Sequence, residues 1–132
     1  MRYLLDTNIV SGLVRNPQGS VTDRIRQEGE SQVCTSIIVA AELRYGAVKR
    51  QSKRLSDQLE AVLGALELLP FEPPADKAYG DLRHQLEKAG QTIGGNDLLI
   101  AAQALATGLT VVTGNMREFA RIDGLRCENW LR

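Results

Sequence analysis

The stretch MRYLLDTN at residues 1–8 decides the fold, because a short apolar run ends there in a single carboxylate. Residues 2–5 predict a buried strand, and Asp6 follows it directly. In open α/β folds, the residues just after a parallel strand lie at the carboxyl edge of the sheet, where binding sites form. Asp6 is therefore a candidate site residue, although taken alone it is slightly better explained as the N-cap of a helix predicted for residues 7–15.

The remainder of the chain alternates between strand and helix patterns. Apolar or β-branched runs predict further strands at residues 32–36, 68–71, 109–113 and 125–128. Apolar residues at helical spacing predict helices at residues 20–28, 37–50, 55–66, 75–89, 97–106 and 116–122. No hairpin turn joins two predicted strands, so we expect an α/β fold with a short, mostly parallel sheet flanked by helices on both faces.

Length and composition fit one ordinary globular domain. The chain has 132 residues, of which 43% are hydrophobic and 24% charged, and Lys+Arg equals Asp+Glu at 16 each. This balance argues against a tail-driven nucleic-acid binder, but not against a nuclease whose site acids offset a basic rim. Cys34 and Cys127 have no CxxC or histidine partner, and no signal peptide or membrane-spanning run is present, so we expect a cytoplasmic protein with no membrane partner.

Two further acids occupy positions where burial would be unfavourable. Glu42 lies within the apolar run at residues 39–43, and Asp97 opens an apolar helix that leads into the strand at residues 109–113. Asp97, like Asp6, has a simpler explanation when taken alone, as a helix cap. In a doubly wound sheet, however, all three carboxylates can face one crevice at the carboxyl edge of the strands.

A hard divalent ion would explain three crowded carboxylates. Unpaired carboxylates repel one another and raise each other's pKa, whereas Mg²⁺ or Mn²⁺ prefers oxygen ligands. We expect Asp6 and Asp97 to be the metal ligands. Zinc is disfavoured because His84, the only histidine, lies on the polar face of its predicted helix. Such an ion suits phosphodiester hydrolysis by an activated water.

Four segments of the chain resemble the PIN-domain nucleases, and among them the VapC toxins of bacterial toxin–antitoxin pairs. They are MRYLLDTN (1–8), TSIIVAAELRYGA (35–47), GGNDLLIAAQALATGLTVVTGN (94–115) and MREFARIDGLRCENW (116–130). The resemblance implies a single PIN domain over residues 1–132, folded as an α/β/α sandwich. It also implies a Mg²⁺- or Mn²⁺-dependent endoribonuclease that inhibits translation by cutting RNA such as tRNA. A VapB-like antitoxin and a second copy of the chain, forming a homodimer, are the implied protein partners.

The resemblance also implies roles for particular acids. Asp6, Glu42 and Asp97 match the three core catalytic acids of the family. Many members carry a fourth acid just after the last long strand, where this chain has Asn115. Glu118 lies one helical turn further on, and whether Asn115 or Glu118 completes the site stays open at this stage, as does the number of metal ions.

Polar and basic residues around the acids are candidates for supporting roles. Asn8 and Thr113 match family positions that support the acids. Arg44, Lys49 and Arg50 belong to a basic run with no acid in it and are candidate RNA contacts. A solvated helix end, complementing the helix dipole, explains the same run equally well.

The main alternative is a PIN-like module that binds RNA or a protein partner with little or no catalysis. Asn115 in place of the fourth acid favours this alternative. Retention of the three core acids argues against it, because a binding protein gains nothing from their mutual repulsion. A haloacid-dehalogenase-like phosphatase fits less well, since it needs a second aspartate at the position of Asn8.

Overall fold

The computed structural model describes residues 2–131, which contain a five-stranded sheet with the order β3-β2-β1-β4-β5. Its strands are β1 (Tyr3–Leu5), β2 (Val33–Ser36), β3 (Glu67–Leu69), β4 (Thr110–Val112) and β5 (Cys127–Glu128). Every neighbouring pair is parallel, which confirms the predicted fold class. Each strand is shorter than predicted, because the boundary residues already turn into the connections to the helices.

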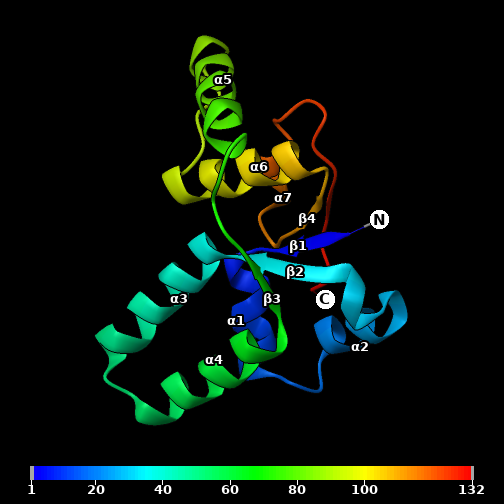
Figure 1. Cartoon of the computed structure of the whole chain (residues 1–132), viewed down its shortest axis with the longest axis vertical. Coiled ribbons are helices and arrows are strands. Elements are labelled where there is room, and N and C mark those ends of the chain that lie inside the picture. The colour runs from blue at the N-terminus through cyan, green and yellow to red at the C-terminus, as the bar shows by residue number, and fades with distance from the viewer. Residues whose placement is uncertain (1, 132) are drawn as a thin grey trace.

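Helices cover both faces of this sheet, as predicted. They are α1 (Thr7–Arg15), α2 (Ser20–Glu28), α3 (Ile37–Arg50), α4 (Lys53–Ala65), α5 (Ala75–Lys88), α6 (Gly95–Thr107) and the short α7 (Met116–Phe119), with a 3₁₀ turn at Glu30–Gln32. Figure 1 shows α1 to α4 on one side of the sheet and α5 to α7 on the other. No helix within residues 2–131 has the length and apolar character needed to cross a bilayer.

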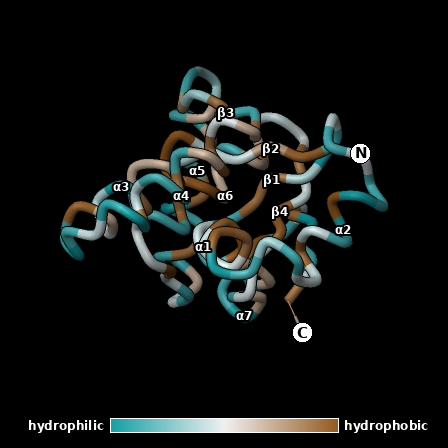
Figure 2. Tube along the Cα trace, turned by 90° about the horizontal axis from the view of Figure 1, so that it is seen from below, coloured by the Kyte–Doolittle hydropathy of each residue, from teal (hydrophilic) through white to brown (hydrophobic). Residues whose placement is uncertain are grey.

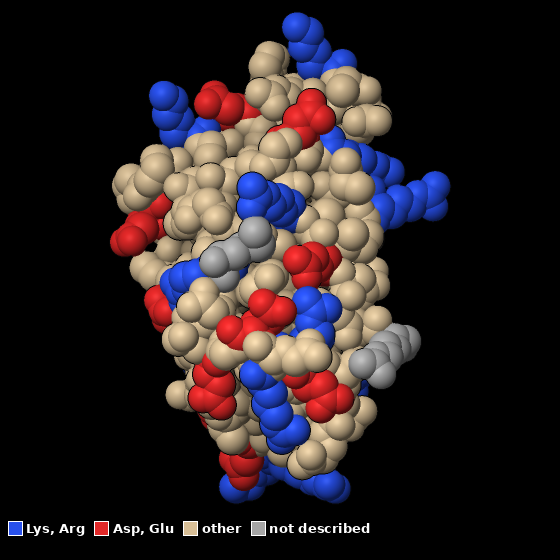
Figure 3. Space-filling view, turned by 90° about the vertical axis from the view of Figure 1, so that its right-hand side faces the viewer, with Lys and Arg blue, Asp and Glu red and all other residues tan. Residues whose placement is uncertain are grey.

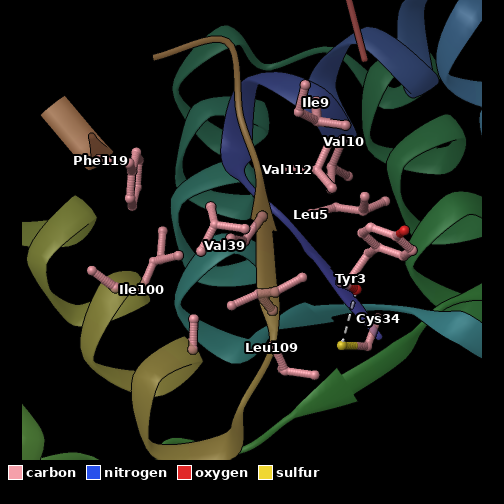
Figure 4. Packing of buried hydrophobic residues seen from close by; sticks show 14 of the residues in the cluster. Tyr3, Leu5, Ile9, Val10, Cys34, Val39, Ile100, Leu109, Val112 and Phe119 are labelled. Carbon is pink, nitrogen blue, oxygen red and sulfur yellow. Dashed lines mark hydrogen bonds between the residues drawn. The ribbon is translucent and has the colours of Figure 1, made fainter. Parts of the chain in front are cut away.

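The central strands are apolar because both of their faces are covered. Leu4, Leu5, Val111 and Val112 are fully buried, and Figure 2 shows hydrophobic colour concentrated along β1, β2 and β4. Side chains from β1, β4, α1, α3 and α6 meet in the core drawn in Figure 4. A parallel sheet packed on both faces reads as continuous apolar runs, which is why the strands were visible in the sequence.

The direction of the chain across the sheet reverses at β1. From β1 the chain adds β2 and β3 on one side, and it then returns to place β4 and β5 on the other. Leu5 pairs with Val112, and the Asp6 amide donates to the Val112 carbonyl at 2.9 Å. The carboxyl ends of β1 and β4 therefore form the switch point at which open α/β sheets place their sites.

Candidate active site

Asp6 is held in place from two sides at this switch point. It is the N-cap of α1, as one sequence explanation predicted, and its Oδ1 accepts from the Thr7 amide at 2.7 Å. Its Oδ2 accepts from the hydroxyl of Thr113, which follows β4, also at 2.7 Å. Only 3% of Asp6 is exposed, so the same carboxylate caps α1 and lies buried at the edge of the site.

Burial makes the ionised form of Asp6 less favourable. Desolvation raises the pKa of the Asp6 carboxyl above its ordinary value, and the nearby Glu42 charge raises it further. The hydrogen bonds from Thr113 and Thr7 act in the opposite direction, because they favour the carboxylate. The hydrogen bonds therefore offset only part of the cost of burying the Asp6 charge, and a bound cation would offset the rest.

Glu42 reaches the same edge from α3, which follows β2. The Thr7 hydroxyl donates to Glu42 Oε1 at 2.9 Å, while the Thr7 amide donates to Asp6. Thr7 therefore connects two acids that lie far apart in the sequence. It was not among the predicted site residues, and its place directly after Asp6, at the start of a helix, was the available signal.

Asp97 lies in the first turn of α6 rather than at its cap. Gly94 is the N-cap residue and makes no side-chain capping bond, so the explanation of Asp97 as a helix cap is wrong. The Asn115 side-chain amide donates to Asp97 Oδ2 at 3.1 Å and to Glu118 Oε2 at 2.6 Å. The structure thus brings both Asn115 and Glu118 to Asp97, the two residues between which the sequence left a choice.

Asp97 and Glu118 behave as one coupled pair. Burial, contact with the Glu118 carboxylate and the Asp6 charge raise the pKa of Asp97 to about 7. Contact with the Asp97 carboxyl, together with hydrogen bonds from Asn115 and the Gly94 amide, lowers the pKa of Glu118. A proton shared near neutral pH is one way to relieve repulsion between these acids, and a bound cation is another.

Asn8 supports a loop rather than an acid. Its Oδ1 accepts from the Gly114 amide at 3.1 Å, and its side chain is otherwise exposed. A Cβ at Gly114 would lie 2.8 Å from Asn8 Nδ2 and 3.0 Å from a Leu131 methyl. Only glycine therefore fits at position 114 without displacing Asn8 or Leu131. This close packing lets the loop place Thr113 and Asn115 next to the acids.

The acids form a connected network rather than a closed cage. Hydrogen bonds run from Glu42 through Thr7 to Asp6, and from Asp6 to Thr113. The Asn115 amide donates in turn to Thr113 Oγ1 at 2.9 Å, and the Asn115 side chain reaches Asp97 and Glu118. Across residues 2–131, however, no three His, Cys, Asp or Glu side chains already form a group that could hold a metal ion.

The donor chemistry of this network nevertheless fits a hard divalent ion. All four charged groups are carboxylates, Asp6 is buried, and burial together with the neighbouring acids raises the pKa of Asp97 to about 7. Such an ion prefers oxygen ligands and retains several waters, so it does not require a complete protein cage.

The predicted RNA contacts have different surroundings. Arg44 Nε and Nη2 each lie 3.0 Å from a carboxylate oxygen of Glu60 on α4, so its guanidinium is already engaged. Lys49 and Arg50, in the last turn of α3, are exposed. On the α2 side of the molecule, drawn in Figure 3, basic and acidic side chains interleave without a continuous basic patch.

Comparison with known proteins identifies the family. The PIN domain profile matches residues 3–125. A ribonuclease VapC2 of Haemophilus influenzae is 38% identical over 132 residues, covering 99% of each chain. A tRNA(fMet)-specific endonuclease VapC of Shigella flexneri is 34% identical over 131 residues, covering 98% of each. The crystal structure of VapBC2 from Rickettsia felis, bound to a promoter DNA fragment, superposes with a TM-score of 0.90 at 38% identity, covering 98% of this chain and 99% of that one. The protein therefore belongs to the PIN-domain family, in its VapC ribonuclease branch.

Proposed function

We propose that this protein is a divalent-metal-dependent endoribonuclease that acts as the toxin of a type II toxin–antitoxin pair. Its metal is Mg²⁺ or Mn²⁺, and its substrate class is structured RNA, with tRNA the first candidate. The observation that carries the proposal is the acidic network at the β1–β4 switch point. Hydrogen bonds through Thr7, Thr113 and Asn115 connect its four carboxylates, which come from distant parts of the chain. Cleavage of the RNA would inhibit translation. The protein would act in the cytoplasm, where its RNA substrate is found.

The acids divide into two roles in this proposal. Asp6 and Asp97 are the metal ligands, and Glu42 and Glu118 complete the negative site from α3 and α7. When bound, the divalent ion supplies an activated water and neutralises charge on the scissile phosphodiester. Glu118 supports enzymatic function over a purely binding role, because it brings an acid to the position where the sequence has Asn115.

The neutral residues of the network orient these acids. Thr113 fixes one oxygen of Asp6, and Thr7 fixes the other oxygen and Glu42. The Asn115 side chain donates to both Asp97 and Glu118, which keeps their oxygens directed towards the site. Such hydrogen bonds around metal ligands typically contribute about 10–100-fold to affinity or activity.

Partners are proposed from the relatives. The matched Rickettsia felis structure is a complex of a VapC with VapB, which supports a VapB-like antitoxin as the inhibitor of this chain. The Shigella flexneri relative is named for tRNA(fMet), which supports initiator tRNA as the first substrate to test. A homodimer, with Arg44, Lys49 and Arg50 near bound RNA, completes the proposal, although the pairing of Arg44 with Glu60 makes Arg44 the weakest of these contacts.

The direct test uses purified protein freed of antitoxin. We expect total tRNA and a structured control RNA to be cut in Mg²⁺ or Mn²⁺, and EDTA to stop the cutting. Asp97→Asn should fold normally and be inactive, because it keeps the shape of the side chain and removes its charge. RNA left intact by the wild-type protein in both metals would refute the proposed function.

A further inference from the structure

A surface cavity of about 120 Å³ lies between α1, α3 and α4, with Glu42 in its lining. Helix α1 contacts both α3 and α4, and Figure 1 shows it against the open end of that helix pair. The volume is several times the roughly 10–15 Å³ that a single water needs, which leaves room for a planar ring but not for a helix. We call this space the Glu42 cavity, since Glu42 also belongs to the acidic network.

The walls of the Glu42 cavity are largely apolar. Val14 of α1, Leu43 of α3, and Leu55 and Leu59 of α4 line it. Gly46 of α3 lines it as well, and a Cβ at Gly46 would meet no atom within 4 Å. A glycine inside a helix costs about 1 kcal/mol relative to alanine, so the open space at Gly46 comes at a loss of helix stability.

Two arginines line the same cavity without a carboxylate partner. Within residues 2–131, neither Arg15 nor Arg50 forms an ion pair, and the one hydrogen bond of Arg15 goes from Nε to the Ser11 carbonyl at 3.3 Å. Arg44, on the same helix as Arg50, is instead neutralised by Glu60. With two guanidiniums against the single carboxylate of Glu42, the lining carries net positive charge.

We propose that the Glu42 cavity binds one unpaired nucleotide of the RNA substrate, next to the phosphodiester that is cleaved. The base packs against the apolar walls, and the guanidiniums of Arg15 and Arg50 hold the adjoining phosphate. This inference rests on the proposed function, and it specifies that the RNA substrate is single-stranded at the cut site. It also adds Arg15, which the sequence did not single out, to the candidate RNA contacts.

Charge and position favour RNA over a peptide as the occupant. Free guanidiniums recognise phosphate through charge-assisted hydrogen bonds, and enzymes that act on nucleic acids enclose extruded bases between apolar or aromatic side chains. Glu42 joins the cavity to the acids that surround the scissile phosphate, so one nucleotide spans both. By contrast, Figure 3 shows basic and acidic side chains interleaved on the α2 side.

The first experiment fills the cavity. Gly46→Leu places a side chain in the open space, and Gly64→Leu is its control. Gly64 also lies in a helix, near the end of α4, with open space around it, but it does not line the cavity. Both changes are made in Asp6→Asn protein, and binding of a short labelled single-stranded RNA is measured by fluorescence anisotropy. We expect Gly46→Leu to raise the Kd about tenfold, the factor given by loss of one base contact, and Gly64→Leu to leave it unchanged.

The second experiment removes the guanidiniums, whose exposed positions leave folding intact. Arg15→Ala and Arg50→Ala should each weaken RNA binding and reduce its dependence on salt by the share of about one phosphate contact. Arg54→Ala is the control, because Arg54 is exposed in the first turn of α4 and does not line the cavity. Equal effects of Arg54→Ala and Arg50→Ala would indicate a diffuse basic rim and overturn the proposal.

Two further outcomes would overturn it as well. RNA binding that is the same in the Gly46→Leu and Gly64→Leu proteins would exclude a nucleotide from the cavity. Weakened binding of the antitoxin with unchanged RNA binding would assign the cavity to the protein partner. Because binding is measured without cleavage, a wild-type protein that cuts no RNA refutes the proposed function and leaves this test valid.

Discussion

The two halves of the acidic network are built differently. Asp6 is 3% exposed and is fixed by hydrogen bonds from Thr7, at the start of α1, and from Thr113, which directly follows β4. Asp97 is only partly buried, and its partners Asn115 and Glu118 lie on the loop after β4 and on the short helix α7. One half is thus an anchor set by the sheet, whereas the other is a pair of acids whose charge state depends on a proton or a cation.

The largest effect is expected from removing the charge of the anchor. Asp6→Asn should lower RNA cleavage by roughly 10³-fold or more, because a metal ligand contributes several kcal/mol of charge stabilisation in the transition state. The fold should persist, since an asparagine can still cap α1. Cleavage rates and circular dichroism measure both results, and near-wild-type cleavage would exclude Asp6 as a ligand.

The second-largest loss of cleavage is expected from changing Thr113, which hydrogen-bonds to the anchor Asp6. Thr113→Val keeps the shape of Thr113 and removes the hydroxyl that donates to Asp6. We expect cleavage to fall about 10–100-fold, and the free energy of unfolding to fall by about 1–3 kcal/mol because a buried carboxylate loses a partner. Thr113→Ser is the matched control and should recover most of both losses. Failure of serine to rescue would mean that packing, not the hydroxyl, matters at this position.

Changes in the Asp97–Glu118 pair, the adjustable half of the network, should reduce cleavage less and should also alter its pH dependence. Glu118→Gln removes the neighbouring charge that helps to raise the pKa of Asp97, so the acidic limb of the pH–rate profile should shift to lower pH. We expect a loss of about tenfold at neutral pH, in the range of residues that surround metal ligands. Asn115→Ala is compared in the same assay. A profile that does not move in Glu118→Gln protein would separate Glu118 from the site.

Stability without metal should also report on the pair. The pKa of Asp97 is raised from 3.8 to about 7. Between these two pH values the folded state therefore holds a proton that the unfolded chain has lost. This stabilisation is complete below about pH 4 and is lost as the pH rises through 7. The expected change is on the order of 1–2 kcal/mol, because partial exposure of Asp97 reduces the effect of its shift and the lowered pKa of Glu118 acts in the opposite direction. Urea titrations at several pH values measure it, and Asp97→Asn should flatten the dependence.

The smallest effect is expected outside both halves. Arg44 pairs with Glu60 on the exposed surface of α3 and α4, and such pairs contribute about 0.2–1 kcal/mol. Arg44→Ala should therefore change stability by less than about 1 kcal/mol and leave RNA cleavage within about twofold of wild type. A large loss of cleavage would instead show that Arg44 exchanges Glu60 for RNA phosphate.

The elements of the fold could be predicted because their signals are local. Helices α1 and α3 have the predicted bounds, since spacing of apolar residues and capping residues mark helices directly. Strand ends were less accurate, because they depend on hydrogen bonds between distant segments. The order β3-β2-β1-β4-β5 follows from no local pattern, although it is what creates the site.

The site was visible in the sequence only where burial made an acid conspicuous. Asp6 stands out because it ends an apolar run, and Asp97 because it begins one. Thr7 and the Gly114 turn do not, since a threonine or a glycine is ordinary at these positions. Their roles depend on contacts across many residues, such as the 35 positions that separate Thr7 from Glu42. Sequence spacing along one helix or strand carries no information about such contacts.

The central claim is that the anchor and the adjustable pair form one site for a divalent ion. Calorimetric titration of Mn²⁺ into antitoxin-free protein near pH 7, in buffers of different ionisation enthalpy, tests it most directly. We predict saturable binding with proton release, because Asp97 must lose its proton to act as a ligand. Binding should be lost in Asp6→Asn and in Asp97→Asn protein alike. Undiminished Mn²⁺ affinity in either variant would contradict the claim.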